Sequence, residues 1–241
     1  MTAFANAAKA ECRSDFQSIS DFYKPHHHLE SLDKAESLLR LAHRFALHMS
    51  QLVSGAEGRA ENQRIFLEEI RSDAVHLVHV LFLGDARAAK FYMRSIVENF
   101  WRHHYFKNHL IEYGWLHERA GFFLTMESLR DYCKSTKLTS CELGAAVGNL
   151  SNYFSALSGE VHSSRANSLV LRETVSQIIL TSADSKKIAA ILNGLSKDII
   201  LLVSVSEASI FDSMSGARRA YCLNFLDATR RRYRQNSLGL V

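Results

Sequence analysis

The chain has 241 residues, of which 47% are hydrophobic, 22% are charged and only one is proline. The hydrophobic share is too high for a disordered chain, and a formal charge of +4 is too mild to indicate nucleic-acid binding by itself. Because proline costs about 3 kcal/mol inside a helix, its scarcity favours long helices. The sequence also has no sustained run of alternating apolar and polar residues, so we predict an all-α fold, a helical bundle.

The cysteine spacing and the apolar segments of the chain indicate in which cellular compartment the protein is expected. The four cysteines are scattered with no Cys-x-x-Cys pair, which predicts reduced thiols and no cysteine-bound metal. The stretch MTAFANAAKAECRSD has no apolar core of signal-peptide length, and the longest apolar run, Ile199 to Val203, is too short to span a bilayer. We therefore expect a soluble cytoplasmic protein with no membrane contact, no metal site and no cofactor.

Residues 1–30 are expected to form an N-terminal extension, because their hydrophobic pattern is only weakly periodic. Pro25 and the three histidines after it indicate a loop, and adjacent loop residues rarely converge on one metal ion. Residues 31–241 are expected to form a single helical domain. Its core is placed at about 31–164, and the C-terminal helices within 166–234 are expected to pack on it.

Apolar residues that recur every three or four positions predict the helices. The strongest patterns cover 31–54, 60–83 and 139–158. Shorter helices are expected within 110–137, and two more helices within 166–213, of which the longer runs from 185 to 212. A last helix covers 217–234. In the helix predicted for 60–83, His76 and His79 lie within an apolar run, and we interpret them as core histidines with satisfied hydrogen bonds.

A long helix is predicted between Asp85, as its N-cap, and His109. Gly84 leaves only a short turn before it, so the two helices of 60–109 should form a long antiparallel hairpin. One face is apolar, through Ala89, Met93, Ile96, Val97 and Phe100. A neighbouring stripe has the same helical spacing and carries charged and aromatic residues: Arg94, Glu98, Trp101, Arg102, Tyr105 and His109.

This stripe is the best candidate for chemistry, because the sequence has none of the common nucleotide-binding, zinc-protease or serine-hydrolase motifs. Arginine can neutralise a phosphate oxygen, and histidine can transfer a proton near neutral pH. Together they suffice for metal-free cleavage of RNA, in which the 2′-hydroxyl attacks the adjacent phosphate. Arg94 and Glu98, however, also form an ordinary i, i+4 ion pair, and the two aromatic residues can serve packing alone.

The segment RHHYFKNH resembles a motif of the helical HEPN superfamily, the higher-eukaryote and prokaryote nucleotide-binding domains. The ribonucleases of that superfamily carry an Arg, a short spacer that often begins with Asn, Asp or His, and then a His. Arg102, His103 and His109 fit this motif with its longest spacer. The segments RSIVEN and YFSALSGEVHSS are also similar to bacterial HEPN-like proteins found near phage-defence and toxin–antitoxin systems, and the resemblance covers about 60–165.

The resemblance implies RNA as the substrate or ligand, a protein partner from a defence or toxin–antitoxin system, and a homodimer with its cleft between two copies. In active members the motif usually begins a late helix, where this chain has His162 without an Arg before it. Three alternatives remain: Arg102 and His109 form the site, Arg94 and Glu98 supply charge beside His162, or the site is degenerate. A different hypothesis is a non-catalytic interaction or scaffold subunit that binds a partner protein or nucleic acid.

The last predicted helix ends in an arginine-rich segment that includes Arg230, Arg231, Arg232 and Arg234. With Tyr105, these arginines are the candidate nucleic-acid-binding residues. Cations in a final helical turn are also favoured by the helix dipole alone, so a solvated helix end is the simpler interpretation of this segment.

Overall fold

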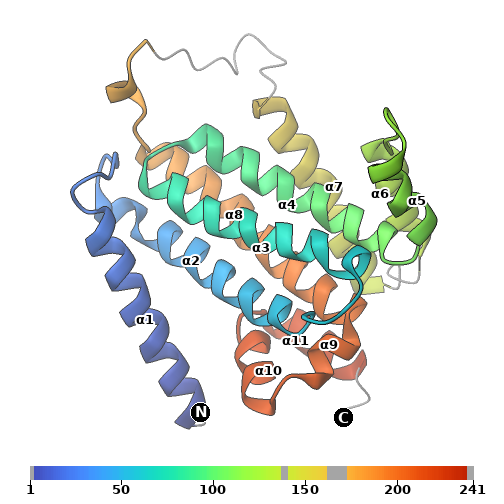
Figure 1. Ribbon diagram of the computed structural model, residues 1–241. Coiled ribbons are helices and arrows are strands. Elements are labelled where there is room, and N and C mark those ends of the chain that lie inside the picture. The colour runs from blue at the N-terminus through green and yellow to red at the C-terminus, as the bar shows by residue number, and fades with distance from the viewer. Residues whose placement is uncertain (1–2, 137–140, 162–172, 238–241) are drawn as a thin grey trace.

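The computed structural model describes residues 3–136, 141–161 and 173–237. Within these ranges it contains eleven α-helices, one 3-10 helix and no strand, which confirms the all-α class and the helical bundle (Figure 1). The α-helices are α1 (Ala3–Tyr23), α2 (Leu32–Ser54), α3 (Glu61–Phe82), α4 (Ala86–Phe106), α5 (Leu110–Glu118), α6 (Met126–Ser135), α7 (Cys141–Val161), α8 (Ser182–Ser206), α9 (Ala208–Ser213), α10 (Gly216–Leu223) and α11 (Ala228–Ser237). The 3-10 helix, Val175–Gln177, precedes α8.

The predicted hairpin is formed by α3 and α4, which pack along their length (Figure 1). Asp85 is the N-cap of α4, as expected, and its Oδ1 accepts hydrogen bonds from the backbone N–H groups of Arg87 (3.0 Å) and Ala88 (2.9 Å). The five apolar positions predicted for α4 are all fully buried: Ala89, Met93, Ile96, Val97 and Phe100. The helix ends at Phe106, three residues earlier than the sequence suggested.

Gly84 makes the tight turn of the hairpin possible. Its φ of +76° lies in the left-handed region, and a Cβ atom at this position would collide with the carbonyl oxygen of His28. That same carbonyl accepts from the backbone N–H of Leu180 at 3.0 Å, and the Leu180 carbonyl accepts from Glu30 N–H at 3.2 Å. The turn, the segment before α2 and the segment before α8 are thereby held together.

α8 runs through the bundle in contact with α2, α4 and α7. Of the helices in the described ranges, it alone is long and apolar enough to cross a membrane by length and composition, and most of it is buried inside the bundle, as in any core helix. α8 is therefore part of the core, whereas the sequence analysis placed the core at about 31–164. The helix expected from 185 to 212 is divided at Glu207 into α8 and α9.

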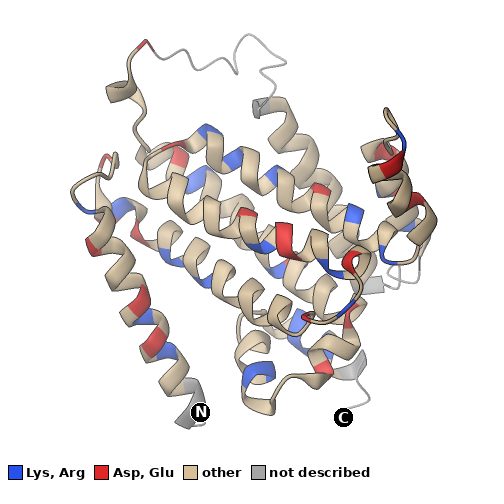
Figure 2. Cartoon of the chain, in the orientation of Figure 1, with Lys and Arg blue, Asp and Glu red and all other residues tan. Residues whose placement is uncertain are grey.

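Within the expected N-terminal extension, residues 3–23 form a helix, which the weak periodicity did not predict. α1 packs against α2 and α10, with Phe16 buried and the Tyr23 ring stacked on Phe82 at 5.0 Å. Acidic and basic residues alternate along the rest of the helix (Figure 2). The apolar contact of α1 follows one narrow stripe, Phe16, Ile19 and Tyr23, which stands out little among the polar residues around it.

The interpretation of His76 and His79 as core histidines was wrong, because both side chains are exposed on α3. His79 Nδ1 lies 2.5 Å from the hydroxyl of Tyr23, and His76 stacks on Tyr92 with 5.1 Å between the ring centroids. The apolar run around them is buried by its other members, including Leu77, Val78 and Leu81.

Candidate functional site

The charged stripe of α4 forms a ladder of ion pairs along the helix. The Arg94 guanidinium lies 2.7 Å from Glu98 Oε1 and 5.0 Å from the centre of the Phe154 ring of α7. Glu98 Oε2 lies 3.6 Å from Arg102 Nη2. Glu98 therefore connects two arginines, and its side chain is only 14% exposed, so this carboxylate is held within the protein surface.

Arg102 is the end of the ladder that solvent can reach, because its side chain is 34% exposed. Its Nη1 donates to Asn99 Oδ1 at 3.1 Å, and Asn99 Nδ2 in turn donates to buried Asp73 at 2.9 Å. Since the guanidinium is fixed by Glu98 and Asn99, it is held in place before any ligand arrives.

His109 lies beyond the end of α4 as the N-terminal flanking residue of α5, so it does not share the α4 face as expected. Its ring instead folds back and stacks on Tyr105, with 3.9 Å between centroids and 9° between planes. His109 Nδ1 donates to the Tyr105 carbonyl at 2.7 Å, which leaves Nε2 as the proton acceptor of the neutral ring. This ring is half-buried.

Tyr132 of α6 completes the cluster, which the sequence pattern gave no reason to expect. Its ring lies edge-on to His109 at 5.0 Å and to Tyr105 at 4.9 Å. Burial, reinforced by the negative charge of Glu112, raises the pKa of the Tyr105 hydroxyl, which therefore stays protonated as a donor. We refer to Arg102, Tyr105, His109 and Tyr132 as the α4-end site.

The two histidines between Arg102 and Tyr105 are buried and have structural contacts. His104 Nε2 lies 2.9 Å from Thr136 Oγ1, and burial lowers the pKa of His104 to about 3. His103 Nε2 lies 2.9 Å from Glu207 Oε1, and burial lowers the pKa of His103 as well. Neither ring is accessible to a ligand of the α4-end site.

The arginines of the C-terminal segment are mostly engaged within the protein. Arg230 pairs with Asp198 and Asp227, Arg231 donates to the carbonyls of Leu223 and Leu226, and Arg234 is buried over the Phe211 ring. The side chain of Arg232 is exposed. These contacts fasten α11 to the bundle, and they leave Arg232 as the most accessible of the four arginines for a phosphate.

His162 lies outside the described residues. In the described part of the chain, no three His, Cys, Asp or Glu side chains gather in an arrangement that could hold a metal ion. Comparison with known protein families, with curated proteins and with solved structures finds no match to this chain.

Proposed function

We propose that the protein binds single-stranded RNA at the α4-end site and cleaves it without a metal ion. The observation that carries this proposal is the stacked Tyr105–His109 pair, whose half-buried imidazole lies toward the same end of α4 as the partly exposed Arg102. The resemblance of Arg102, His103 and His109 to the HEPN ribonuclease motif agrees with it. On this basis the chain would act as an effector of a bacterial defence or toxin–antitoxin system.

The chemistry would use each residue in one role. Arg102 neutralises a phosphate oxygen, and His109 Nε2 accepts the proton of the 2′-hydroxyl as that oxygen attacks phosphorus. The bond to the 5′ oxygen breaks, which gives a 2′,3′-cyclic phosphate and a free 5′-hydroxyl. The leaving oxygen needs a proton from a second imidazole, either His162 or the His109 of a second copy in a homodimer. Arg94 and Glu98 are positioning residues, since they hold Arg102.

The experiment is an RNA-cleavage assay with purified protein, end-labelled single-stranded RNA and excess EDTA. We expect His109→Ala to slow cleavage by roughly 100-fold or more, because positioned proton transfer contributes about 10²–10⁴-fold to rate. Arg102→Ala should cause a similar loss. His117→Ala is the matched control, because that histidine is exposed on neighbouring α5 and should be dispensable.

A non-catalytic interaction subunit is the second candidate function, and an exposed apolar surface favours it. Leu110 (66% exposed) and Ile111 (69%) on α5 and Phe123 (73%) after it are large apolar side chains open to solvent. A partner protein of a defence or toxin–antitoxin system would cover them. RNA binding without any cleavage, or cleavage that is equal in wild type and His109→Ala, would favour this second function over the first.

A further inference from the structure

A cleft of about 510 Å³ lies between α1, α2 and α10, away from the α4-end site. Four basic side chains line it: Lys9 and Arg13 from α1, and Arg40 and Arg44 from α2. None of the described residues that line this cleft is Asp or Glu, although Arg40 also pairs with nearby Glu36 at 2.6 Å. The cleft therefore favours an anionic ligand.

Cys12 and His43 line this cleft, and Asp15 contacts His43 from outside it. Cys12 Sγ lies 3.9 Å from His43 Nδ1, and the opposite ring nitrogen, Nε2, lies 2.7 Å from Asp15 Oδ2. This is the order of groups in a nucleophilic triad: thiol, imidazole and an orienting carboxylate. His43 is 4% exposed while Asp15 is 49% exposed, so the carboxylate holds a buried ring from the solvent side.

The electrostatics of the pair favour a reactive thiolate. Burial alone would raise the pKa of Cys12, but the hydrogen bond and charge of His43 outweigh it, and the pKa of the thiol is lowered. Burial alone would lower the pKa of His43, but Cys12 and Asp15 outweigh it, and the pKa of the imidazole is raised. A thiolate beside an imidazolium is the nucleophilic form of such a pair.

Tyr221 of α10 faces Cys12 from across the cleft. Its hydroxyl helps to lower the pKa of the Cys12 thiol. Burial, with the negative charge of Cys12, raises the pKa of Tyr221 far above its usual value, so the hydroxyl remains a donor. A protonated donor next to the nucleophile can stabilise an oxyanion that forms on the attacked carbonyl.

His48 supplies a second, independent sign of a ligand. It lines the same cleft, its side chain is 1% exposed, and its Nδ1 has no hydrogen-bond partner. Burial lowers the pKa of His48 to about 3, so the ring is neutral and can accept or donate one hydrogen bond. Because buried polar atoms are normally satisfied, an orphaned nitrogen at a cleft wall points to a polar group that binds there.

We propose that the cleft is a thiol-dependent acyl-transfer site for an anionic ester or thioester, with Cys12 as nucleophile and His43 as proton-transfer group. Cys12 Sγ forms a bond to the acyl carbon, and the bond to the leaving group breaks as that group takes the proton of His43 Nδ1. Water then attacks the thioester carbon, His43 accepts a proton from that water, and the carbon–sulfur bond breaks. The products are a carboxylic acid and the Cys12 thiolate beside the His43 imidazolium, which is the starting form of the pair. Asp15 is a positioning residue, because it acts through His43.

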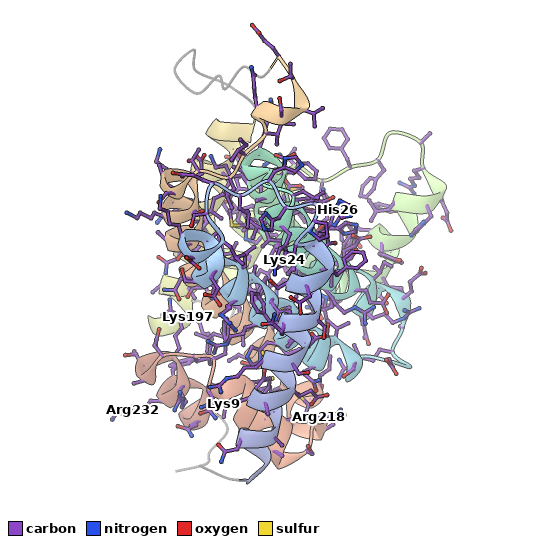
Figure 3. All side chains as sticks on the ribbon, turned by 90° about the vertical axis from the view of Figure 1, so that its left-hand side faces the viewer. Lys9, Lys24, His26, Lys197, Arg218 and Arg232 are labelled. Atoms are coloured by element: carbon purple, nitrogen blue, oxygen red, sulfur yellow. The ribbon has the colours of Figure 1, made fainter. Side chains whose placement is uncertain are left out.

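Figure 3 looks onto α1 and labels Lys9 and Arg218, which lie to the two sides of this helix and line two neighbouring hollows. Cys12 and Tyr221 line both hollows, so the thiol can be approached from either side. The other ionisable groups that line these hollows and bear on the titration of the Cys12–His43 pair are Lys9, Glu11, Arg13, Arg40, Arg44, His48, Arg218 and Tyr221.

The test uses the full chain and two matched probes, the anionic mono(4-nitrophenyl) glutarate and the neutral 4-nitrophenyl butyrate. We expect one equivalent of 4-nitrophenol to be released in a rapid burst, with the acyl group found on Cys12 by peptide mass spectrometry. The glutarate ester should react about tenfold faster than the butyrate ester, and Arg13→Gln should reduce that preference. Cys12→Ser should abolish the burst, and His43→Gln should slow it by roughly 100-fold.

Cys133→Ala is the matched control, because burial raises the pKa of that thiol to about 12 and it should not react. Asp15→Asn tests whether Asp15 positions His43 without disturbing the fold, because the Asp15 side chain is half-exposed. Without its carboxylate the imidazolium is less stable, so the pH midpoint of acylation should move upward while the circular dichroism spectrum is unchanged. Equal acylation of wild type and His43→Gln, an unchanged midpoint in Asp15→Asn, or equal rates for both esters would overturn the proposal.

Discussion

Glu207→Gln is expected to destabilise the protein by roughly 3 kcal/mol, because it removes the one negative charge from a buried cluster of donors. Glu207 is 5% exposed at the junction of α8 and α9. Its Oε1 accepts from His103 Nε2 (2.9 Å) and Lys107 Nζ (2.7 Å), and its Oε2 lies 3.1 Å from Arg59 Nη1. A glutamine would leave Lys107 and Arg59 uncompensated. Thermal or urea unfolding measures the loss.

The stabilisation that Glu207 provides is expected to decrease at acidic pH. Burial alone would raise the pKa of Glu207, but its hydrogen bond with His103 and the charge of Lys107 outweigh it, and the pKa falls from 4.5 to about 2. Since the folded pKa is the lower one, the stabilisation is complete above about pH 4.5 and is lost as the pH falls toward 2. In Glu207→Gln, the free energy of unfolding should therefore depend less on pH in this acidic range. Glu68→Gln is the control, because Glu68 forms a surface pair with Arg64, and it should change stability by less than about 1 kcal/mol. A loss as small as the control's would show that the cluster contributes little.

Asp198→Ala is expected to have a still larger effect, a loss of about 4 kcal/mol in the free energy of unfolding. The fully buried carboxylate accepts from Arg230 Nε (2.8 Å) and Nη2 (2.6 Å), from Asn149 Nδ2 (3.1 Å) and from the Tyr153 hydroxyl (3.3 Å). It therefore joins α7, α8 and α11 at one point. Alanine would leave those donors without an acceptor inside the protein.

The measurement is the unfolding midpoint by calorimetry, which should fall by about 10 °C for a chain of this size. Asp227→Asn is the matched control, because Asp227 also pairs with Arg230 but is 37% exposed. Its effect should stay below about 1 kcal/mol. Equal shifts of the unfolding midpoint in both variants would show that the burial of Asp198 does not make its ion pair with Arg230 more stabilising than the exposed pair.

Local patterns predicted much of this fold. The α4 stripe is buried at every predicted apolar position, Asp85 caps the helix, and Gly84 turns the hairpin. These features depend on residues within a few positions of each other, where helical period and cap chemistry act directly. The end of α4 was misplaced because Lys107 and Asn108 are compatible with a helix and only the contacts around His109 show where it stops.

Long-range polar contacts could not be predicted in the same way. His103 and Glu207 are 104 positions apart, and nothing in either segment indicates the other. Cys12 and His43 are 31 positions apart, and no local pattern in α1 indicates His43 as the partner of Cys12. The stacking of Tyr105 on His109 also depends on α5 starting at a new angle. Such contacts follow from how helices pack, and a single sequence does not encode that packing as a pattern.

Equilibrium binding of purified protein to a fluorescent single-stranded RNA, titrated at several salt concentrations, tests the proposed function most directly. We expect binding that weakens as salt rises, and a roughly tenfold loss of affinity in Tyr105→Ala, because base stacking contributes about 1–3 kcal/mol. Tyr92→Ala is the control, since Tyr92 stacks on His76 at the other end of α4. Absence of binding at low salt, or equal affinities of the two variants, would contradict RNA recognition at the α4-end site.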